Sequence, residues 1–415
     1  MEDSGTIRTL DKYVGSSLCL LFSVLHKFRP RKKPEAIKNV LIIELFEMGA
    51  AIMAYPSLTY IREQLDNPNI YVLTLDRVKS SWEILKTVPD DHYFTIESRN
   101  IVTFGLSMLK QIWRLRRRKI DLIIDFELFM RIPTIISYLI RSKLRAGFNR
   151  YKMEGLYRGS FYDITCAFNQ NSHISKNFLA LTKTAIQQEK HLPNYKGAIP
   201  SAEIKIPKYR SDRALRATVI EKLKGYYPYE NNDLYVISPD VGSVLPVRNY
   251  PKDFLVTVIT ELLNLNKKAL AVLIGLDENL PICNYIQEKT HNTRCINFCG
   301  KTDSVFELME LLFLSKLTIS NDNGHAHFAS LTDTRLIALF STDSPYMYGP
   351  LGNCVILYSH FHCSPCISAF NHKSSVCKNN LCLQAIEPET VVKFSRDILK
   401  GKLTYRTINN EIPYI

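Results

Sequence analysis

The stretch SNDNGHAHFAS, residues 320–330, combines residue types that bind anions at the point where a buried strand meets a helix. The start of a helix leaves backbone N–H groups unpaired and presents the positive end of the helix dipole. Gly324 permits close approach of the backbone, and His327 lies within reach of a bound group. Asp322, Asn323, Gly324 and His327 are therefore predicted to hold a diphosphate. The alternative is that Asp322 only caps the helix.

A second loop, SPDVGSVLPVRNYPKDF, follows a predicted strand in the same way. It offers the hydroxyl of Ser243 and the guanidinium of Arg248 close to Gly242. An arginine can hold a phosphate through two parallel hydrogen bonds. The alternative is that Arg248 stacks on Tyr250 at the surface. In the turn GLDEN, Glu278 is the candidate acceptor for ribose hydroxyls.

Four cysteines lie in CSPCISAFNHKSSVCKNNLC, which opens with the spacing C-x-x-C. Four such thiols can enclose a zinc ion tetrahedrally. The second pair is spaced C-x4-C, which is less diagnostic, and the alternative is a set without metal. Because four thiolates leave no open coordination position, such a zinc would be structural. The candidate ligands are Cys363, Cys366, Cys377 and Cys382.

The chain has 415 residues, which is enough for two domains, and 46% hydrophobic and 22% charged residues are typical of a globular protein. Its formal net charge of +13 suits nucleic acid, an anionic membrane surface or phosphorylated substrates. Basic residues cluster at 29–33, 114–119 and 141–150, although each cluster could be a solvated face. No nucleic-acid partner is expected, since the sequence offers no helix-turn-helix, RRM-like or zinc-finger element.

Ten cysteines in a chain of this size do not indicate a disulfide scaffold, and a reducing compartment is expected. No secretory signal is expected either. The apolar stretch 13–28 is shorter than the roughly 20 residues that span a bilayer, and the basic residues RPRKK follow it. This pattern predicts a helix that lies in the membrane interface. The alternative is a helix packed on the protein's own surface.

Apolar strands and amphipathic helices alternate from Asn39 onward, which predicts an α/β protein with parallel sheets. Pro56 is expected inside the first helix of this series, where it would bend the chain. The predicted strands cover 39–45, 69–75, 92–96, 119–126, 233–240, 268–275, 295–300, 317–322 and 335–341.

The alternation lapses between Glu189 and Asp233, a stretch rich in Pro, Lys and Ser, which predicts two doubly wound domains. A ligand is expected outside the carboxyl ends of the strands and between the domains. The predicted division is an N-terminal segment 1–37, a first domain 38–200, a linker 201–232, a second domain 233–390 and an extension 391–415.

Residues 38 to about 390 resemble the heptosyltransferases of glycosyltransferase family 9, and four stretches carry the resemblance in order. They are NVLIIELFEMGAAIMAYPSLTYIRE, DLIIDFELFMRIPTIISYLIRSKLRAGFNR, PDVGSVLPVRNYP and INFCGKTDSVFELMELLFLSKLTISNDNGHAHFASLTDTRLIALFSTDSP. The resemblance implies a GT-B fold, with two Rossmann-like domains facing a central cleft. It also implies inverting, metal-independent transfer of a sugar, heptose, from an ADP-sugar to a lipopolysaccharide core-type acceptor. The implied location is cytoplasmic, at the inner face of the inner membrane.

Residue roles follow from the same resemblance. Ser243 and Arg248 match a hydroxyl and a basic residue that contact the donor diphosphate in the family. Asp322, Gly324 and His327 match its Asp-x-Gly-x-x-His donor loop. Because family members bind acceptors mainly with the first domain, its basic clusters are expected to meet the phosphates of a lipid-linked oligosaccharide.

The first loop departs from the family pattern. That loop usually ends in Gly-Asp, and its Asp is the candidate base, whereas this chain has Gly49-Ala50. Alanine cannot accept a proton, so Glu47 in the same loop and Glu44 at the end of the strand become the candidate bases. The alternative is a non-catalytic nucleotide-sugar-binding protein that retains the fold.

Overall fold

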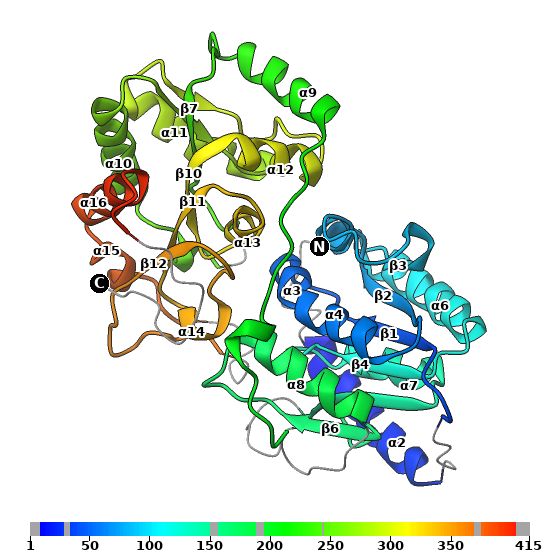
Figure 1. Ribbon diagram of the computed structural model, residues 1–415. Helices are drawn as coiled ribbons and strands as arrows, with labels where there is room; N and C mark the ends of the chain where they lie inside the picture. The colour runs from blue at the N-terminus through cyan, green and yellow to red at the C-terminus, as the bar shows by residue number, and fades with distance from the viewer. Residues whose placement is uncertain are drawn as a thin grey trace. The chain divides into compact units, whose positions relative to one another are not determined.

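The computed structural model describes residues 9–28, 34–149, 157–187, 195–242, 245–368 and 375–403. The chain forms two compact units, one up to Ile204 and one from Lys205 onward. Each unit contains a six-stranded sheet with helices packed on it (Figure 1). The predicted fold class, α/β with two doubly wound parallel sheets, is confirmed.

The first sheet has the strand order β3-β2-β1-β4-β5-β6. Its central strands are apolar and buried on both faces, as parallel strands covered by helices must be, and Val40 of β1 lies opposite Ile70 of β2 and Leu122 of β4. The strand order reverses between β1 and β4, so their carboxyl ends form the position where such sheets bind ligands. The strands are β1 Asn39–Ile43, β2 Asn69–Leu75, β3 Tyr93–Ile96, β4 Leu122–Asp125, β5 Leu144–Asn149 and β6 Ile164–Ala167.

The helices of the first unit form two groups. In one group α4 (Tyr55–Gln64) contacts α8 (Ile174–Gln187), and α3 (Met48–Met53) contacts α4, α5 (Lys79–Glu83) and α8. In the other, α6 (Ile101–Arg117) and α2 (Ser16–Lys27) both contact α7 (Ile132–Ile140). Right-handed crossovers place the two groups on opposite faces of the sheet. Short turns of helix are η1 Asp11–Gly15, η2 Asp76–Val78, η3 Asp90–His92 and η4 Ser201–Glu203.

The helix expected to run through Pro56 is two helices, α3 and α4, with Ala54 between them. Pro56 lies in the first turn of α4, where a missing N–H removes no helical hydrogen bond. The proline therefore starts a second helix instead of bending a single one.

The apolar stretch near the N-terminus forms η1 and α2. One face of α2 packs on the first unit, where Cys19 contacts Ile135 and Phe161 in an apolar cluster. Asp11 pairs with Arg131 at 3.1 Å and fixes the start of the segment. The opposite face of α2 is exposed. No helix in the described part of the chain is both long enough and apolar enough to cross a bilayer.

The second sheet has the order β12-β11-β10-β7-β8-β9. Its strands are β7 Asp233–Ser238, β8 Ala269–Leu273, β9 Cys295–Asn297, β10 Ser315–Asn321, β11 Arg335–Phe340 and β12 Cys354–Tyr358. Its helices are α9 Arg213–Lys224, η5 Pro246–Arg248, α10 Lys252–Leu265, η6 Asp277–Asn279, α11 Leu280–Thr290, α12 Val305–Leu314, α13 Gly324–Ser330, α14 Pro345–Tyr348, α15 Leu381–Gln384 and α16 Pro388–Leu399. Helix α16 packs against α10, β10 and β11 and so completes the cover of this sheet.

The predicted strands did not include β5, β6 or β12, and helix α9 was not predicted. The stretch 201–232, predicted as a linker, contains α9, whose N-cap Asp212 accepts hydrogen bonds from the N–H groups of Ala214 and Leu215. The stretch 201–232 therefore contains a regular helix and is not only a linker.

Candidate active site

Arg248 lies between two carboxylates at the carboxyl ends of three neighbouring strands. It ends η5 after β7, whereas Asp322 follows β10 and Asp343 follows β11. Its Nη1 atom is 3.4 Å from Oδ2 of Asp343 and 3.6 Å from Oδ2 of Asp322, and both carboxylates are buried. The alternative stacking partner, Tyr250, is buried instead, and its hydroxyl donates to the carbonyl of Ile386 at 2.5 Å. Arg248 is thus held in place by acidic partners.

Asn323, and not Asp322, caps the helix after β10. Its Oδ1 accepts a hydrogen bond from the backbone N–H of His325 at 2.9 Å. One of the N–H groups that were predicted to bind a diphosphate therefore already has a partner. Its Nδ2 donates to the hydroxyl of Ser238 at 2.9 Å and to the carbonyl of Asp240 at 3.1 Å. The loop after β10 is therefore tied to the loop after β7.

His325 lies inside this connection. Its Nδ1 is 2.8 Å from the hydroxyl of Ser238, and burial lowers the pKa of His325 to about 4. The ring is therefore neutral at physiological pH, and its hydrogen bond to Ser238 connects α13 to β7. His327 is buried in α13, and Gly324 is the first residue of that helix.

Asp240 organises the loop after β7 by accepting hydrogen bonds on both oxygens. Gly242, in this loop, has a φ of +83°, and a Cβ there would lie 3.2 Å from Oε1 of Glu278. The exposed carboxylate predicted to bind ribose therefore lies beside Gly242. Ser243 lies outside the described residues. The donors to Asp240 are the N–H groups of Val241 (2.7 Å) and Gly242 (3.1 Å) and the side-chain amides of Asn249 (2.5 Å) and Asn279 (2.8 Å).

In the first unit, three glutamates gather at the carboxyl ends of β1 and β4. Glu44 follows β1 directly, Glu47 is the N-cap residue of α3, and Glu127 follows β4. Oε1 of Glu127 accepts the N–H groups of Leu45 at 2.7 Å and Phe46 at 3.2 Å. Oε1 of Glu44 accepts the N–H of Glu47 at 3.2 Å. Both predicted bases therefore share one site with a third carboxylate.

The two buried glutamates, Glu44 and Glu127, have raised pKa values. Burial raises the pKa of Glu44 well above its ordinary value, and the charges of Glu127 and Glu47 raise it further. Burial also raises the pKa of Glu127, to about 7, although the N–H of Leu45 opposes the shift. Both shifts favour the protonated form of the buried carboxyl groups. Glu47 is the least buried of the three and the most accessible to a ligand.

A buried ion pair supports the backbone that carries Glu127. Nη2 of Arg158 lies 2.6 Å from Oδ2 of Asp125, and Tyr162 donates its hydroxyl to the same oxygen. The guanidinium also donates to the carbonyls of Met130, at 2.9 Å, and Glu127. Both charged groups are paired and hydrogen-bonded, which offsets the cost of burying them.

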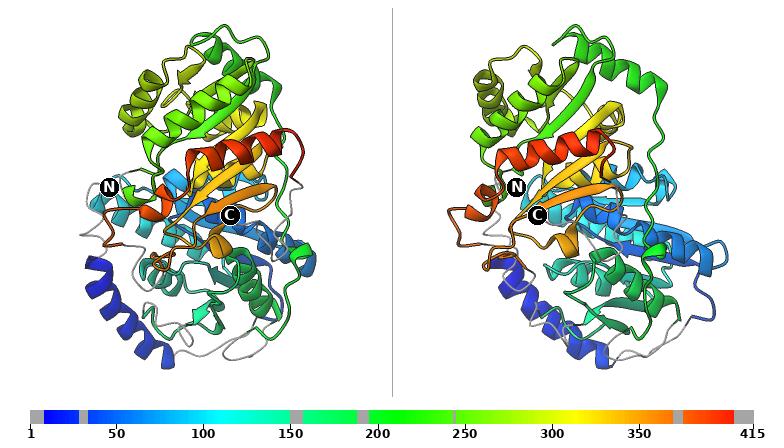
Figure 2. Two further views of the ribbon diagram at one scale, coloured as in Figure 1. Left: turned by 90° about the vertical axis from the view of Figure 1, so that its left-hand side faces the viewer. Right: turned by 60° about the vertical axis from the view of Figure 1, so that its left-hand side comes forward.

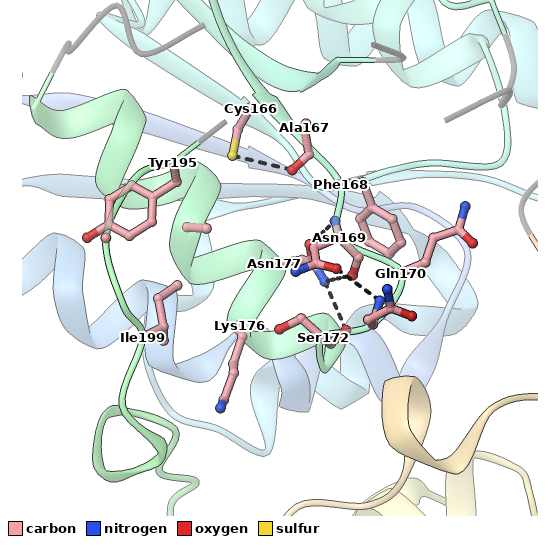
Figure 3. A pocket seen from close by; sticks show the side chains of 13 residues that line it. Cys166, Ala167, Phe168, Asn169, Gln170, Ser172, Lys176, Asn177, Tyr195 and Ile199 are labelled. Carbon is pink, nitrogen blue, oxygen red and sulfur yellow. Dashed lines mark hydrogen bonds between the residues drawn. The ribbon is translucent and has the colours of Figure 1, made fainter. Parts of the chain in front are cut away.

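A cavity of about 640 Å³ opens at the carboxyl end of β6 and the start of α8 (Figure 3). Tyr195 and Ile199 lie on one side of it, and Asn169 and Gln170 lie on the other. The lining contains amide, hydroxyl and amine groups, which can hydrogen-bond to sugar hydroxyls or phosphate. The lining residues are Cys166, Ala167, Phe168, Asn169, Gln170, Asn171, Ser172, Lys176, Asn177, Ala180, Tyr195, Gly197 and Ile199.

Two contacts place this cavity on the same edge of the sheet as the glutamates. The hydroxyl of Ser175, at the start of α8, donates to the carbonyl of Met53 at the end of α3 at 2.6 Å. Phe178 of α8 stacks on Phe126, which follows β4, at a centroid distance of 4.4 Å. A ligand in the cavity and the candidate base therefore belong to one face of the first unit.

The four cysteines of the predicted zinc site are free thiols. Sγ of Cys366 lies 3.4 Å from the hydroxyl of Ser375, and Sγ of Cys377 donates to the carbonyl of Asn379 at 3.1 Å. Among the described residues, no three His, Cys, Asp or Glu side chains lie close enough together to hold a metal ion. Cys363 and Cys382 likewise belong to no such group, and structural zinc stays a prediction for metal analysis.

Sequence reasoning missed Glu127, Asp240, Asp343 and Arg158. The three acidic residues lie within three residues of a strand end, close to where Glu44 and Asp322 lie, so a search of the loop after every strand would have found them. Arg158 reaches Asp125 across 33 residues, which no local pattern indicates.

Glycosyltransferases with the GT-B fold have two Rossmann-like α/β domains, as this chain does. Residues 108–376 match glycosyltransferase family 9 (heptosyltransferase), and the chain belongs to this family. The predicted family is therefore confirmed.

Solved structures share this fold at low sequence identity. E. coli ADP-heptose LPS heptosyltransferase II is 14% identical with a TM-score of 0.66, over 88% of this chain and 99% of that one. A glycosyltransferase of family 9 from Veillonella parvula DSM 2008 is 15% identical with a TM-score of 0.66, over 89% and 99%. E. coli heptosyltransferase WaaC with ADP is 13% identical with a TM-score of 0.59, over 86% and 99%. No curated protein matches the chain.

Proposed function

We propose that this glycosyltransferase transfers heptose from an ADP-sugar to a lipopolysaccharide core-type acceptor with inversion at the anomeric carbon. Family membership carries the proposal, together with the contact between Arg248 and Asp322 and the position of Glu278 after the neighbouring strand β8. The solved relatives named above, described as an ADP-heptose heptosyltransferase and a heptosyltransferase with ADP, support the choice of donor.

Arg248 would stabilise the leaving diphosphate. Breaking the bond between the sugar and the phosphate builds negative charge on the diphosphate, and a cation already in position lowers the barrier most where that charge develops. Asp322 and Asp343 hold the guanidinium at 3.6 Å and 3.4 Å and so restrict its motion.

Glu47 would take the proton from the attacking hydroxyl. Inversion requires this hydroxyl to approach the anomeric carbon opposite the leaving group, while a base accepts its proton. Ala50 cannot perform this role, and burial raises the pKa of Glu44, which disfavours the ionised form that a base needs. Glu127, whose burial raises its pKa to about 7, anchors the loop through the N–H groups of Leu45 and Phe46.

The polar cavity beside β6 is the candidate subsite for the acceptor. Its amides, hydroxyls and Lys176 offer donors to sugar hydroxyls and phosphates. A lipid-linked acceptor lies in a membrane, so the proposal includes peripheral attachment to the cytoplasmic face of the inner membrane. A reducing cytoplasm also agrees with the ten free cysteines.

A non-catalytic nucleotide-sugar-binding protein is the second candidate, because alanine replaces the family's candidate base at position 50. Incubation of the purified protein with ADP-heptose and a truncated core acceptor separates the two. If the protein is the proposed enzyme, mass spectrometry should show a product that is one heptose heavier than the acceptor. The rate of transfer should be the same with and without EDTA. Binding of ADP-heptose without turnover would favour the second candidate, and failure to bind any nucleotide sugar would refute both.

A further inference from the structure

Helix α6 exposes a stripe of apolar side chains. The exposed residues recur at spacings of three and four, so they lie on one side of the helix: Val102, Leu106, Leu109 and Trp113. Leu106 is 65% exposed and Trp113 is 53% exposed. A continuous apolar stripe on the outside of a unit indicates a surface that meets a partner.

Helix α2 exposes a second stripe. Its inner face carries Cys19, which is fully buried, whereas Leu20, Leu21, Val24 and Leu25 face outward and Leu20 is 60% exposed. Both faces of the helix are therefore apolar, and the packing on the first unit explains only one of them. These outward-facing side chains of α2 are aliphatic, as expected for a helix that inserts into an apolar medium.

The two stripes belong to one layer of helices. Both α6 and α2 contact α7, which lies between them (Figure 1). Nε of Arg116 on α6 donates to the carbonyl of Leu139 on α7 at 2.7 Å, and Phe22 on α2 stacks on Tyr138 of α7 at 4.5 Å. In both views of Figure 2, α2 runs along the outer edge of the first unit.

All the charged side chains that α6 itself carries are basic. Residues 98–120 contain no Asp or Glu. Lys110 and Arg117 flank the stripe, and the guanidinium of Arg117 lies 3.3 Å from the centre of the Trp113 ring. A tryptophan under a basic side chain suits the boundary between headgroups and acyl chains. The basic residues of this segment are Arg99, Lys110, Arg114, Arg116, Arg117, Arg118 and Lys119.

We propose that the outer faces of α6 and α2 dock the protein on an anionic lipid bilayer. The apolar stripes would enter the headgroup boundary, and the basic side chains would contact lipid phosphates. A second copy of the chain fits this surface poorly, because a symmetric dimer would bring the basic segments of two α6 helices together. The inference locates the membrane contact on these two helices, and it requires neither a donor nor a transfer reaction.

The two tryptophans allow a direct test, because Trp82 is fully buried and Trp113 is exposed. Vesicles of phosphatidylcholine mixed with phosphatidylglycerol should shift tryptophan emission to the blue, and brominated lipid should quench it. The variant Trp113→Phe should still sediment with vesicles but lose both signals. Binding without a Trp113 signal would place the contact elsewhere and overturn the proposal, as would a concentration-dependent shift in the absence of vesicles, which indicates self-association.

Substitutions of basic and of apolar residues separate the electrostatic contribution to vesicle binding from the hydrophobic contribution. Lys110→Glu with Arg117→Glu should weaken binding to the mixed vesicles by roughly 20-fold or more, since each basic side chain near an anionic surface contributes about fivefold. Leu20→Ser with Leu21→Ser and Val24→Ser should weaken it by at least about tenfold. The control Tyr226→Ser with Leu265→Ser removes similarly exposed apolar groups from the second unit and should change nothing. Equal binding to pure phosphatidylcholine, or equal loss in the control, would refute the proposal. ADP binding measured on the same samples shows whether the donor site is intact.

Discussion

Nη1 of Arg248 lies 3.4 Å from Oδ2 of Asp343, although 95 residues separate the two in the sequence. The loops after β7, β10 and β11 are therefore joined by one guanidinium. Since the carboxylates of Asp322 and Asp343 are both buried, Arg248 compensates negative charge in the free protein. The same group is the proposed ligand of the donor diphosphate, so stability and binding are linked at this residue.

Replacing Arg248 by methionine should reduce both properties. Loss of a charged hydrogen-bond donor should weaken ADP binding about 10- to 100-fold, and two carboxylates left without their cation should destabilise the fold by about 3 kcal/mol. Calorimetric titration and urea unfolding measure the two effects. The double variant Arg248→Met with Asp343→Asn should recover part of the stability but none of the ADP affinity. Recovery of both would remove Arg248 from the donor site.

The donor loop should be sensitive at Asp322 and His327. Asp322→Ala removes a partner of Arg248, and His327→Ala removes a buried side chain from α13, so each should weaken ADP binding about tenfold or more. The matched control is Asp333→Ala, an exposed residue after α13 that pairs only at the surface with Lys208, at 2.7 Å. Titrations in which all three variants bind like the unchanged protein would move the donor away from this loop.

Glu47→Gln should lower kcat for transfer by about 10²- to 10⁴-fold and leave the KM for the donor unchanged, because a general base acts only in the chemical step. Glutamine keeps the size of the side chain but cannot accept the proton. Glu44→Gln is the comparison and should cost less, since burial raises the pKa of Glu44 and so disfavours the ionised form that a base needs. A larger loss in Glu44→Gln than in Glu47→Gln would assign the base to Glu44.

Much of this architecture could be predicted from the sequence because buried parallel strands are continuous apolar runs. The runs NVLII and LIID are typical of strands that helices cover on both faces. Strand β12, CVILY, is an apolar run of the same kind and was overlooked, whereas β6, ITCA, contains a threonine and a single large apolar residue, so its pattern is weak. Helix α9 was missed because a Pro- and Lys-rich stretch was interpreted as a linker, although Asp212 is a typical N-cap.

The residues of the candidate site were predictable only in part. Position at a strand end suggested Glu44, Asp322 and Arg248, because that rule depends on local sequence alone. Which carboxylates approach Arg248, and how Arg158 supports the backbone of Glu127, depend on strand order and on contacts between distant residues. Protonation states depend on burial, which a strand pattern does not reveal for a side chain at the end of a strand.

Glu127 should make the stability of the protein depend on pH around neutrality. Burial raises its pKa from 4.5 to about 7, so the folded protein holds this proton more tightly than the unfolded chain does. The stabilisation is complete below about pH 4.5, declines as the pH rises, and is lost above about pH 7, which amounts to up to about 3 kcal/mol. Glu127→Gln removes the titration, while its amide oxygen can still accept the N–H groups of Leu45 and Phe46.

The variant Glu127→Gln should therefore unfold at nearly the same urea concentration as the unchanged protein at pH 4.5, and at a clearly higher one at pH 8. Urea unfolding across this range measures the difference. Glu63→Gln, an exposed position on α4, is the control and should follow the unchanged protein at every pH. Equal slopes of stability against pH for Glu127→Gln and the unchanged protein would mean that Glu127 is ionised in the folded state. The loop after β1 would then be anchored by a carboxylate whose charge is compensated within the cluster, and Glu44 would be left as the group that holds the proton.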